Sequence, residues 1–206
     1  GTCQEVIIAG ATVKALRVTY VGELGWELHF PIEHALTLYD ALMKAGESFG
    51  IGNAGYRAIE SLRLEKGYRA WASDIGPDYS PLEAGMGWAV KMKSNMPFMG
   101  REAIAEQQER GLSKRLACFV VDDPSIVLLG RETIYRNGER VGWLSSGGWG
   151  YTVGENIGYG YVRNPDGVSM DYLKSGSYEL DIATSRVPCR IQFGALVDAK
   201  MEKIKC

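Results

Sequence analysis

The stretch TYVGELGWELHFP (residues 19–31) places two carboxylates in a run that otherwise has the pattern of a β-strand. The glycines at positions 22 and 25 predict a turn. Beyond this turn, apolar residues alternate with Glu27 and His29, which is typical of a half-buried strand. Successive side chains of a strand point to opposite faces, so Glu27 and His29 should point away from the face that carries Trp26. We therefore expect Glu27 to lie outside the core.

The neighbours of Glu27 suggest what its carboxylate could hold. Its two oxygens can accept charge-assisted hydrogen bonds from two adjacent N–H donors of a flat heterocycle. Tyr20 and Trp26 could cover the faces of such a ring, and His29 lies beside the carboxylate in sequence. The alternative is that Glu23 is simply part of the turn and that Glu27 is solvated on an open sheet face.

Length, composition and net charge limit the classes of binding partner that we expect for this chain. The 206-residue chain is 46% hydrophobic and 23% charged, with a net charge near −2, which gives no electrostatic reason to expect nucleic acid or an anionic membrane as partner. The longest apolar runs, such as ACFVV (117–121), are too short to span a bilayer. The chain begins with Gly1 rather than Met, and we expect it to be a piece of a longer or processed polypeptide.

The cysteines and histidines are too sparse for a metal site. The four cysteines form no CxxC pair, and only His29 and His34 are available as imidazole ligands. We expect reduced thiols and no bound metal ion.

The first half of the chain mixes strand and helix patterns. Residues 13–20 alternate as a half-buried strand, and residues 33–49 have apolar positions at helical spacing. A second helix is predicted over residues 54–67, with Asn53 as its N-cap and Gly67 as its stop signal. Two further helix signals are a Ser80–Glu83 capping box and a polar segment at residues 100–111.

After residue 112 the pattern changes to short strands separated by Gly, Asn, Pro and Asp. Asn137–Gly138 predicts a type I′ hairpin turn. We expect an α+β unit at residues 1–111 and a small β-barrel or sandwich at residues 112–206. The predicted strands are 115–121, 132–137, 139–146, 157–162, 177–183 and 187–193.

The usual catalytic patterns are missing. Neither histidine lies in a recognisable frame for nucleophilic catalysis. The glycine runs SSGGWG (145–150) and GYG (158–160) lack the strand-to-helix context of a phosphate loop, and we interpret both as turns between strands.

Several other side chains have structural interpretations. We interpret Arg57, Arg63 and Glu65 as surface or interdomain partners. Tyr68 and Trp71 are more typical of a core than of a ligand contact. Tyr161 and Tyr178, in the second half, fit either a core or a site.

Four ordered motifs resemble the glycine-cleavage T-protein (aminomethyltransferase) superfamily, and within it the C-terminal half of the sarcosine and dimethylglycine dehydrogenases. Three later segments, IYRNGERVG, IGYGYV and YLKSGSYELDI, are similar to the same group, so the resemblance covers nearly the whole chain. The four motifs are VTYVGELGWELHFP (18–31), GYRAIESLRLEKGYRAW (55–71), DIGPDYSPLEAGMGW (74–88) and FMGREAI (98–104).

The resemblance implies the later portion of a folate-binding α+β domain, followed by a β-barrel domain. It implies tetrahydrofolate as ligand, contacted by Tyr20, by Glu27, Leu28 and His29, and by an aromatic residue at Trp88. Glu27 matches the acid that holds the pterin in the T-proteins.

Two departures from the family pattern matter. T-proteins carry an arginine where this chain has Ile59, so that contact is not carried over. The catalytic Asp of the family lies upstream of the first motif, so no catalytic residue is assigned within this sequence.

By resemblance, an upstream flavin domain binding FAD would oxidise an N-methyl amine to an iminium, and this module would capture the one-carbon unit as methylene-tetrahydrofolate. The fragment alone is then expected to be inactive. The implied location is the cytoplasm in a bacterium and the mitochondrial matrix in a eukaryote. Two alternatives stay open: a non-enzymatic regulatory subunit like that of pyruvate dehydrogenase phosphatase, and a free-standing glycine-cleavage aminomethyltransferase.

Overall fold

A small three-stranded antiparallel sheet begins the chain in the computed structural model, which describes residues 1–205. Its order is β1 (Cys3–Ile8), β2 (Ala11–Leu16) and β3 (Glu27–His29). β2 begins two residues earlier than predicted, and it ends four residues earlier because the Thr19 hydroxyl oxygen accepts hydrogen bonds from three following backbone N–H groups and turns the chain out of the sheet. β3 pairs with β2 alone, so its other edge is open.

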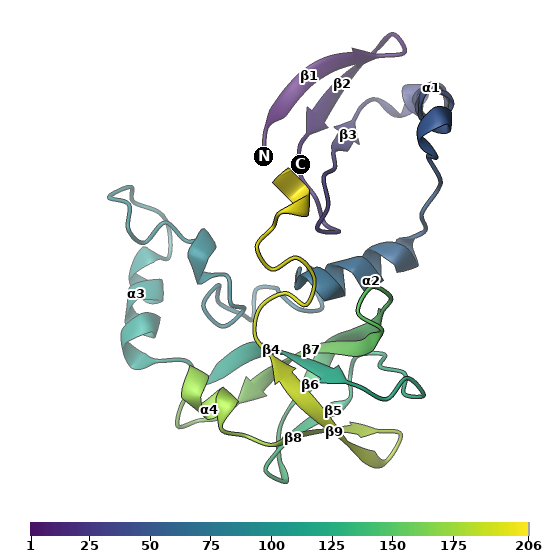
Figure 1. The fold of residues 1–206 in the computed structure, drawn as a ribbon. Helices are drawn as coiled ribbons and strands as arrows, with labels where there is room; N and C mark the ends of the chain where they lie inside the picture. Colours follow the sequence, from purple (N-terminus) through teal and green to yellow (C-terminus); the bar gives the residue numbers. More distant parts are fainter. Residues whose placement is uncertain (206) are drawn as a thin grey trace.

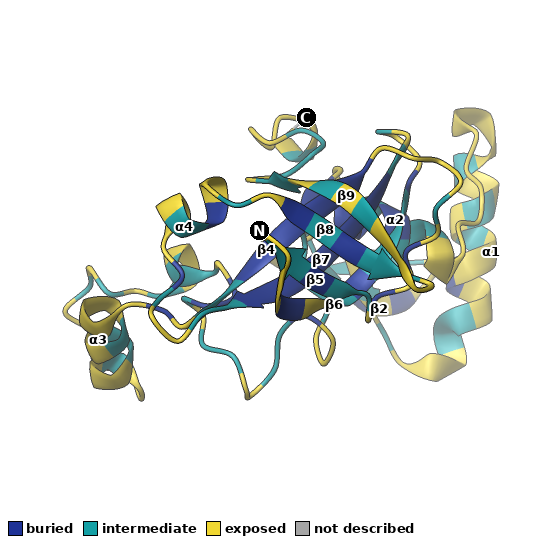
Figure 2. Ribbon diagram, turned by 90° about the horizontal axis from the view of Figure 1, so that it is seen from below, coloured by how far each residue is buried: buried dark blue, intermediate teal, exposed yellow. Residues whose placement is uncertain are grey.

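Helix α1 (Ala35–Gly46) packs on this sheet through Leu38, which is buried with Ala11 and Val13. Single 3₁₀ turns, Ile32–His34 and Glu47–Phe49, extend it at both ends, so the helical prediction over residues 33–49 is confirmed. Most of its outer surface is exposed (Figure 2).

Helix α2 (Tyr56–Lys66) lies between the sheet and the rest of the molecule (Figure 1). It ends at Gly67, whose φ of 74° is the left-handed conformation that favours glycine, as predicted. The N-cap prediction is wrong: Gly55 occupies that position, and the Asn53 amide instead donates to the Tyr39 hydroxyl, 2.7 Å away.

The capping-box hydrogen bonds form, but they do not begin a helix. The Ser80 N–H donates to the Glu83 carboxylate at 2.8 Å, and the Glu83 N–H donates to the Ser80 hydroxyl at 3.2 Å. Residues 81–85 nevertheless form successive turns. The next helix is α3 (Arg101–Arg110), which agrees with the helix predicted over residues 100–111.

Six strands close into a barrel in the order β4-β7-β6-β5-β8-β9, with β9 pairing back to β4. Its core is apolar and includes Phe119, Ile134, Leu144 and Leu180 (Figure 2). The α+β fold with a following barrel is thus confirmed. The strands are β4 (Lys114–Val121), β5 (Thr133–Arg136), β6 (Glu139–Gly150), β7 (Glu155–Arg163), β8 (Tyr178–Ile182) and β9 (Ser185–Gln192), with α4 (Met170–Lys174) before β8.

The hairpin turn between β5 and β6 has the predicted geometry, since Asn137 and Gly138 have φ values of 52° and 85°. The interpretation of the two glycine runs as turns is wrong. Residues 145–150 belong to β6, and residues 158–160 belong to β7. A Cβ at Gly158 would lie 2.4 Å from Leu144 Cδ1, so glycine here gives room for close packing inside the barrel.

Leu64 on α2 packs directly on the barrel. Its side chain is buried in a cluster with Leu116, Ile157 and Tyr159. A Cβ at Gly148 would lie 3.0 Å from Leu64 Cδ1, so the glycines of β6 let the helix approach closely. Within residues 1–205, no helix combines the length and apolar character needed to cross a bilayer.

Because Leu64 joins α2 to the barrel, Leu64→Ala should lower the free energy of unfolding by about 2–5 kcal/mol through lost burial and a residual cavity. Leu36→Ala is the matched control, since Leu36 is 73% exposed on α1 and its loss should change stability by no more than about 0.5 kcal/mol. Urea unfolding measures both. Equal effects of the two substitutions would show that α2 is not seated on the barrel.

Burial raises the pKa of Cys118 and of Cys189 to about 12, whereas Cys3 is exposed. In a Cys206→Ser variant, which removes the cysteine outside the described residues, a thiol reagent at pH 8.5 should modify one thiol per folded chain and three in denaturant. The folded chain keeps both protons up to about pH 12, but unfolded thiols lose theirs near roughly pH 8.5, so stability should fall as pH rises through this window. Rapid modification of all three native thiols would contradict the burial.

Candidate functional site

Glu27 and His29 lie side by side on β3, where both side chains are more than half exposed. The His29 Nε2 and Glu27 Oε2 atoms are 3.3 Å apart. Leu28, between them, turns its side chain to the small core formed by the sheet and α1. The alternation predicted for this strand therefore places the acid outside the core, and the open edge of β3 adds unpaired main-chain groups beside it.

Trp26 departs from its predicted position. It was expected on the core face, but it is 56% exposed. It precedes β3 in a segment without regular structure, so the strand periodicity does not extend to it.

Tyr20 is attached to the segment that follows α2. Its hydroxyl donates to the Arg69 carbonyl at 3.0 Å, and its ring stacks on Tyr68 with centroids 6.0 Å apart. Partial burial raises the pKa of the Tyr20 hydroxyl, so it stays a neutral donor at physiological pH. Tyr68, interpreted from the sequence as a core residue, is only partly buried.

Trp88 lies in a single 3₁₀ turn (Gly87–Ala89) and is 82% exposed. It lines a cavity of about 460 Å³ together with Tyr68, Thr19 and Glu23. The structure therefore brings Trp88 to Tyr68, and through Tyr68 to Tyr20. Glu27 and His29 are not among the residues that line this cavity, whose lining includes Gly25, two positions before β3.

Tyr68 is the residue that sequence reasoning missed. It lies two positions after the lysine that ends α2, directly after the left-handed Gly67, and this turn directs its ring to the cavity. The only signal was its place in the GYRAW motif. Trp71, also expected in the core, is 73% exposed instead.

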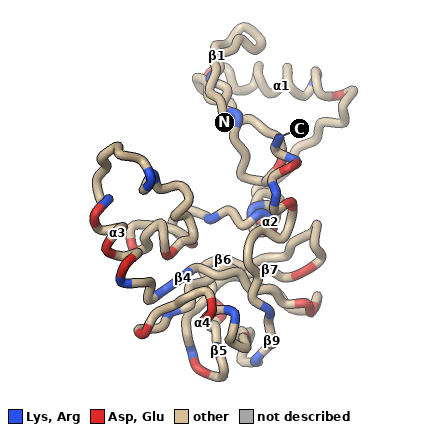
Figure 3. The backbone as a smooth tube through the Cα atoms, turned by 60° about the vertical axis from the view of Figure 1, so that its left-hand side comes forward, with Lys and Arg blue, Asp and Glu red and all other residues tan. Residues whose placement is uncertain are grey.

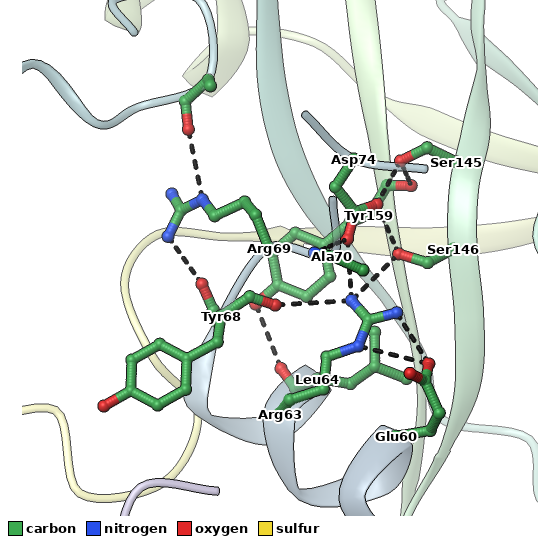
Figure 4. A network of polar contacts seen from close by, with 12 residues as sticks. Glu60, Arg63, Leu64, Tyr68, Arg69, Ala70, Asp74, Ser145, Ser146 and Tyr159 are labelled. Atoms are coloured by element: carbon green, nitrogen blue, oxygen red, sulfur yellow. Dashed lines mark hydrogen bonds and ion pairs between the residues drawn. The ribbon is translucent and has the colours of Figure 1, made fainter. Parts of the chain in front are cut away.

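Of the three residues interpreted as surface or interdomain partners, Arg63 and Glu65 connect α2 to the barrel and Arg57 lies on the surface. Arg63 is buried and donates to the Asp74 carboxylate at 2.8 Å and to the Ser146 hydroxyl at 3.2 Å (Figure 4). The Glu65 carboxylate accepts from the Thr152 N–H at 2.6 Å. Arg57, by contrast, is simply exposed.

The two tyrosines left open are both buried: Tyr178 lies in the barrel core, and Tyr161 lies in the cluster that joins Leu64 of α2 to the outer face of the barrel. Tyr161 donates its hydroxyl to the Asp74 carbonyl at 2.8 Å and stacks on Tyr79, and burial raises the pKa of its hydroxyl. Tyr178 donates to the Leu173 carbonyl at 3.1 Å. Both therefore stabilise the fold and do not face a ligand.

Charge around the site is mixed. Lys, Arg, Asp and Glu are interspersed along the chain (Figure 3), and Glu23 lies 3.5 Å from the Lys203 ammonium. Within residues 1–205, no group of three or more His, Cys, Asp or Glu side chains is arranged to hold a metal ion. The arrangement can accept hydrogen bonds at Glu27 and cover a flat ring at Trp88 and Tyr68, but it contains no paired nucleophile and base.

Comparison with known proteins now adds to this geometry. The family model described as the GCVT N-terminal domain matches residues 1–94, and the one described as the glycine cleavage T-protein C-terminal barrel domain matches residues 114–198. The chain is 44% identical to sarcosine dehydrogenase, mitochondrial, from Mus musculus in an alignment 206 residues long, which covers 99% of this chain and 22% of that protein.

Two further similarities agree with these matches. The chain is 37% identical to the mitochondrial pyruvate dehydrogenase phosphatase regulatory subunit of Mus musculus over 196 residues, covering 89% of this chain and 22% of that protein. A solved structure, the glycine cleavage system aminomethyltransferase T from Bartonella henselae, matches with a TM-score of 0.77 and 26% identity, over 91% of this chain and 50% of that chain.

The chain spans about a fifth of the length of these two mouse relatives. The two family models nevertheless fall on the mixed α/β part and on the barrel, and the aminomethyltransferase has the same fold over both. The chain therefore belongs to the glycine-cleavage T-protein (aminomethyltransferase) superfamily.

Proposed function

We propose that this chain is the tetrahydrofolate-binding module of a longer flavoprotein of the sarcosine or dimethylglycine dehydrogenase type, and that it captures the one-carbon unit of N-methyl amine oxidation as methylene-tetrahydrofolate. What carries this assignment is the match to sarcosine dehydrogenase over 99% of the chain. FAD would belong to the upstream flavin domain, and the location would be the mitochondrial matrix in a eukaryote or the cytoplasm in a bacterium.

The residues present fit a pterin in two respects. Glu27 is an exposed acceptor beside an open strand edge, and two N–H donors of the ring would share or displace the 3.3 Å contact that His29 Nε2 makes with its carboxylate. An indole as exposed as Trp88, set at a cavity shared with Tyr68, has a large apolar face that a planar ligand would cover. Tyr20, Glu27, Leu28, His29 and Trp88 are the residues that we propose contact the ligand, with Leu28 contributing main-chain atoms because its side chain packs inward.

The protein would contribute to the reaction mainly by positioning the two reactants. Tetrahydrofolate, when bound, would supply N5 and N10 as acceptors of the one-carbon unit, and the departing amine would take the two protons that these nitrogens lose. Glu27 would fix the orientation of the ring, and Trp88 and Tyr68 would exclude water from one face. Holding two reactants in a near-attack geometry can contribute several kcal/mol to such a step. The acid–base work would fall to the family's Asp, which lies outside the matched motifs.

A second candidate is a regulatory subunit without catalysis, favoured by the 37% identity to the phosphatase subunit over 196 residues. The two candidates differ in their prediction for the ligand. The dehydrogenase module should bind tetrahydrofolate through Glu27. A purely regulatory chain with the same fold need not bind it at all.

Calorimetric titration with tetrahydrofolate tests the proposed function. Glu27→Gln removes the charge that strengthens the ring contacts, so the Kd should rise about ten- to a hundredfold, the equivalent of losing a charged hydrogen bond. Trp88→Ala should also weaken binding. Glu5→Gln, an exposed acid on β1 of the same sheet, is the matched control and should leave the Kd unchanged.

Two results would overturn the assignment. Equal heats from the unchanged protein and Glu27→Gln would remove Glu27 from the site. No saturable heat with the unchanged protein would remove the folate function itself and favour the regulatory candidate.

A further inference from the structure

A second cavity, of about 260 Å³, lies on the other side of the segment that follows α2. It is bounded by β4, by α4 and by the end of β9, and it shares no lining residue with the cavity at Trp88. Arg69 enters it from the segment after α2, and Arg115 enters it from β4. The proposed folate contacts lie elsewhere, so nothing assigned so far uses this space.

Each of the two guanidinium groups donates to a backbone carbonyl oxygen and also has N–H donors that make no hydrogen bond within the described residues. Arg69 donates to the Gly67 carbonyl at 2.6 Å and to the Ala84 carbonyl at 3.2 Å, and its side chain extends away from Arg63 (Figure 4). Arg115 donates to the Val168 carbonyl at 3.3 Å and to the Met170 sulfur at 3.7 Å. In the part of the chain that the structure describes, the Nη2 group of each arginine makes no hydrogen bond, and neither arginine is in an ion pair.

The charged side chains that line the cavity are all basic. Its described lining contains Lys66, Arg69 and Arg115 but no Asp or Glu. Lys66 is neutralised, because its ammonium lies 2.9 Å from the Asp198 carboxylate. Arg69 and Arg115 have no such partner, and the pKa of Arg115 is lowered by burial, which is the expected effect of desolvating a cation without a counter-charge. An anion in the cavity would remove this imbalance.

The remaining lining sets the size and character of the anion. The side chains of Leu173, Met170 and Phe193 make one part of the wall apolar. About 260 Å³ holds a small ion or a short-chain acid and falls at or below the low end of ordinary cofactor pockets. The planar forks of two arginines match the oxygens of a carboxylate or phosphate.

We propose that this cavity is an oxyanion site, in which a small carboxylate or phosphate accepts hydrogen bonds from Arg69 and Arg115. The apolar wall would cover a short aliphatic group attached to a carboxylate. The site is separate from the folate contacts, so the result of its test does not depend on whether the proposed function is correct.

Thermal unfolding of the protein in acetate, butyrate or phosphate, each compared with chloride at the same ionic strength, tests the site. A ligand that binds only the folded state raises Tm with its concentration. The unchanged protein should show a saturable rise, and Arg69→Gln or Arg115→Gln should increase the apparent Kd at least tenfold or abolish the rise. Arg101→Gln is the matched control, because Arg101, like Arg69, donates to backbone carbonyls but lies outside this cavity.

The results with the three anions distinguish a carboxylate ligand from a phosphate ligand. A rise with butyrate above that with acetate identifies an aliphatic carboxylate, and a rise with phosphate alone identifies a phosphate ligand. No rise with any anion, or an equal rise in all variants, would overturn the site. If Arg115→Gln fails to fold, Arg115→Lys takes its place in the test. Lysine keeps the positive charge but lacks the planar guanidinium group, so this variant should still bind the anion more weakly than the unchanged protein. Tetrahydrofolate heats should be unchanged in Arg115→Gln, which keeps this test separate from the folate titration.

Discussion

The buried ion pair between Arg63 and Asp74 is the interaction on which the rest of the structure depends. Arg63 extends from α2, and Asp74 follows it in a segment that lies against the barrel. The Asp74 carboxylate also accepts from the hydroxyls of Ser145 and Ser146 on β6 (Figure 4). Both charges are almost fully removed from water, so each needs its partners there: Asp74 has Arg63 and the two serines, and Arg63 has Asp74 and, at 2.9 Å, the Glu60 carboxylate.

This pair determines where the ligand-facing groups can lie. The segment between its two partners carries Tyr68, whose ring lines the cavity, and Arg69, whose carbonyl accepts from Tyr20. The C-terminal segment closes the same region, because the Leu196 and Val197 N–H groups donate to the Glu65 carbonyl. The C-terminal segment is thus held to α2, Tyr20 is held to the segment that follows α2, and Arg63 and Leu64 hold α2 to the barrel. In this region one edge of β3 is unpaired and Trp88 is largely exposed, which suits surfaces that meet a ligand.

The sequence predicts most elements because their signals are local. The Asn137–Gly138 turn, the Gly67 stop and the alternating strands of the barrel depend on residues within a few positions of one another. The errors have long-range causes. Gly158 resembles a turn residue but lies in a strand because Leu144 occupies the space of its missing side chain. The short helix α4 has little periodicity to detect, and Asn53 caps nothing because the Tyr39 hydroxyl is within its reach. For the site, the sequence predicts that Glu27 lies outside the core, but not that Tyr68 joins Trp88, since that contact depends on how the segment after α2 is anchored.

A double-mutant cycle on the buried pair tests this account most directly. Arg63→Met, Asp74→Leu and the double variant would be compared with the unchanged protein by urea unfolding. Arg63→Met leaves the Asp74 carboxylate buried without its cation, and Asp74→Leu leaves Arg63 paired with Glu60, whereas the double change removes both charges of the buried pair. The account predicts a coupling free energy of roughly 1–3 kcal/mol between the two positions. Additive effects, with coupling near zero, would contradict it, because the two charges would then stabilise the fold independently of each other.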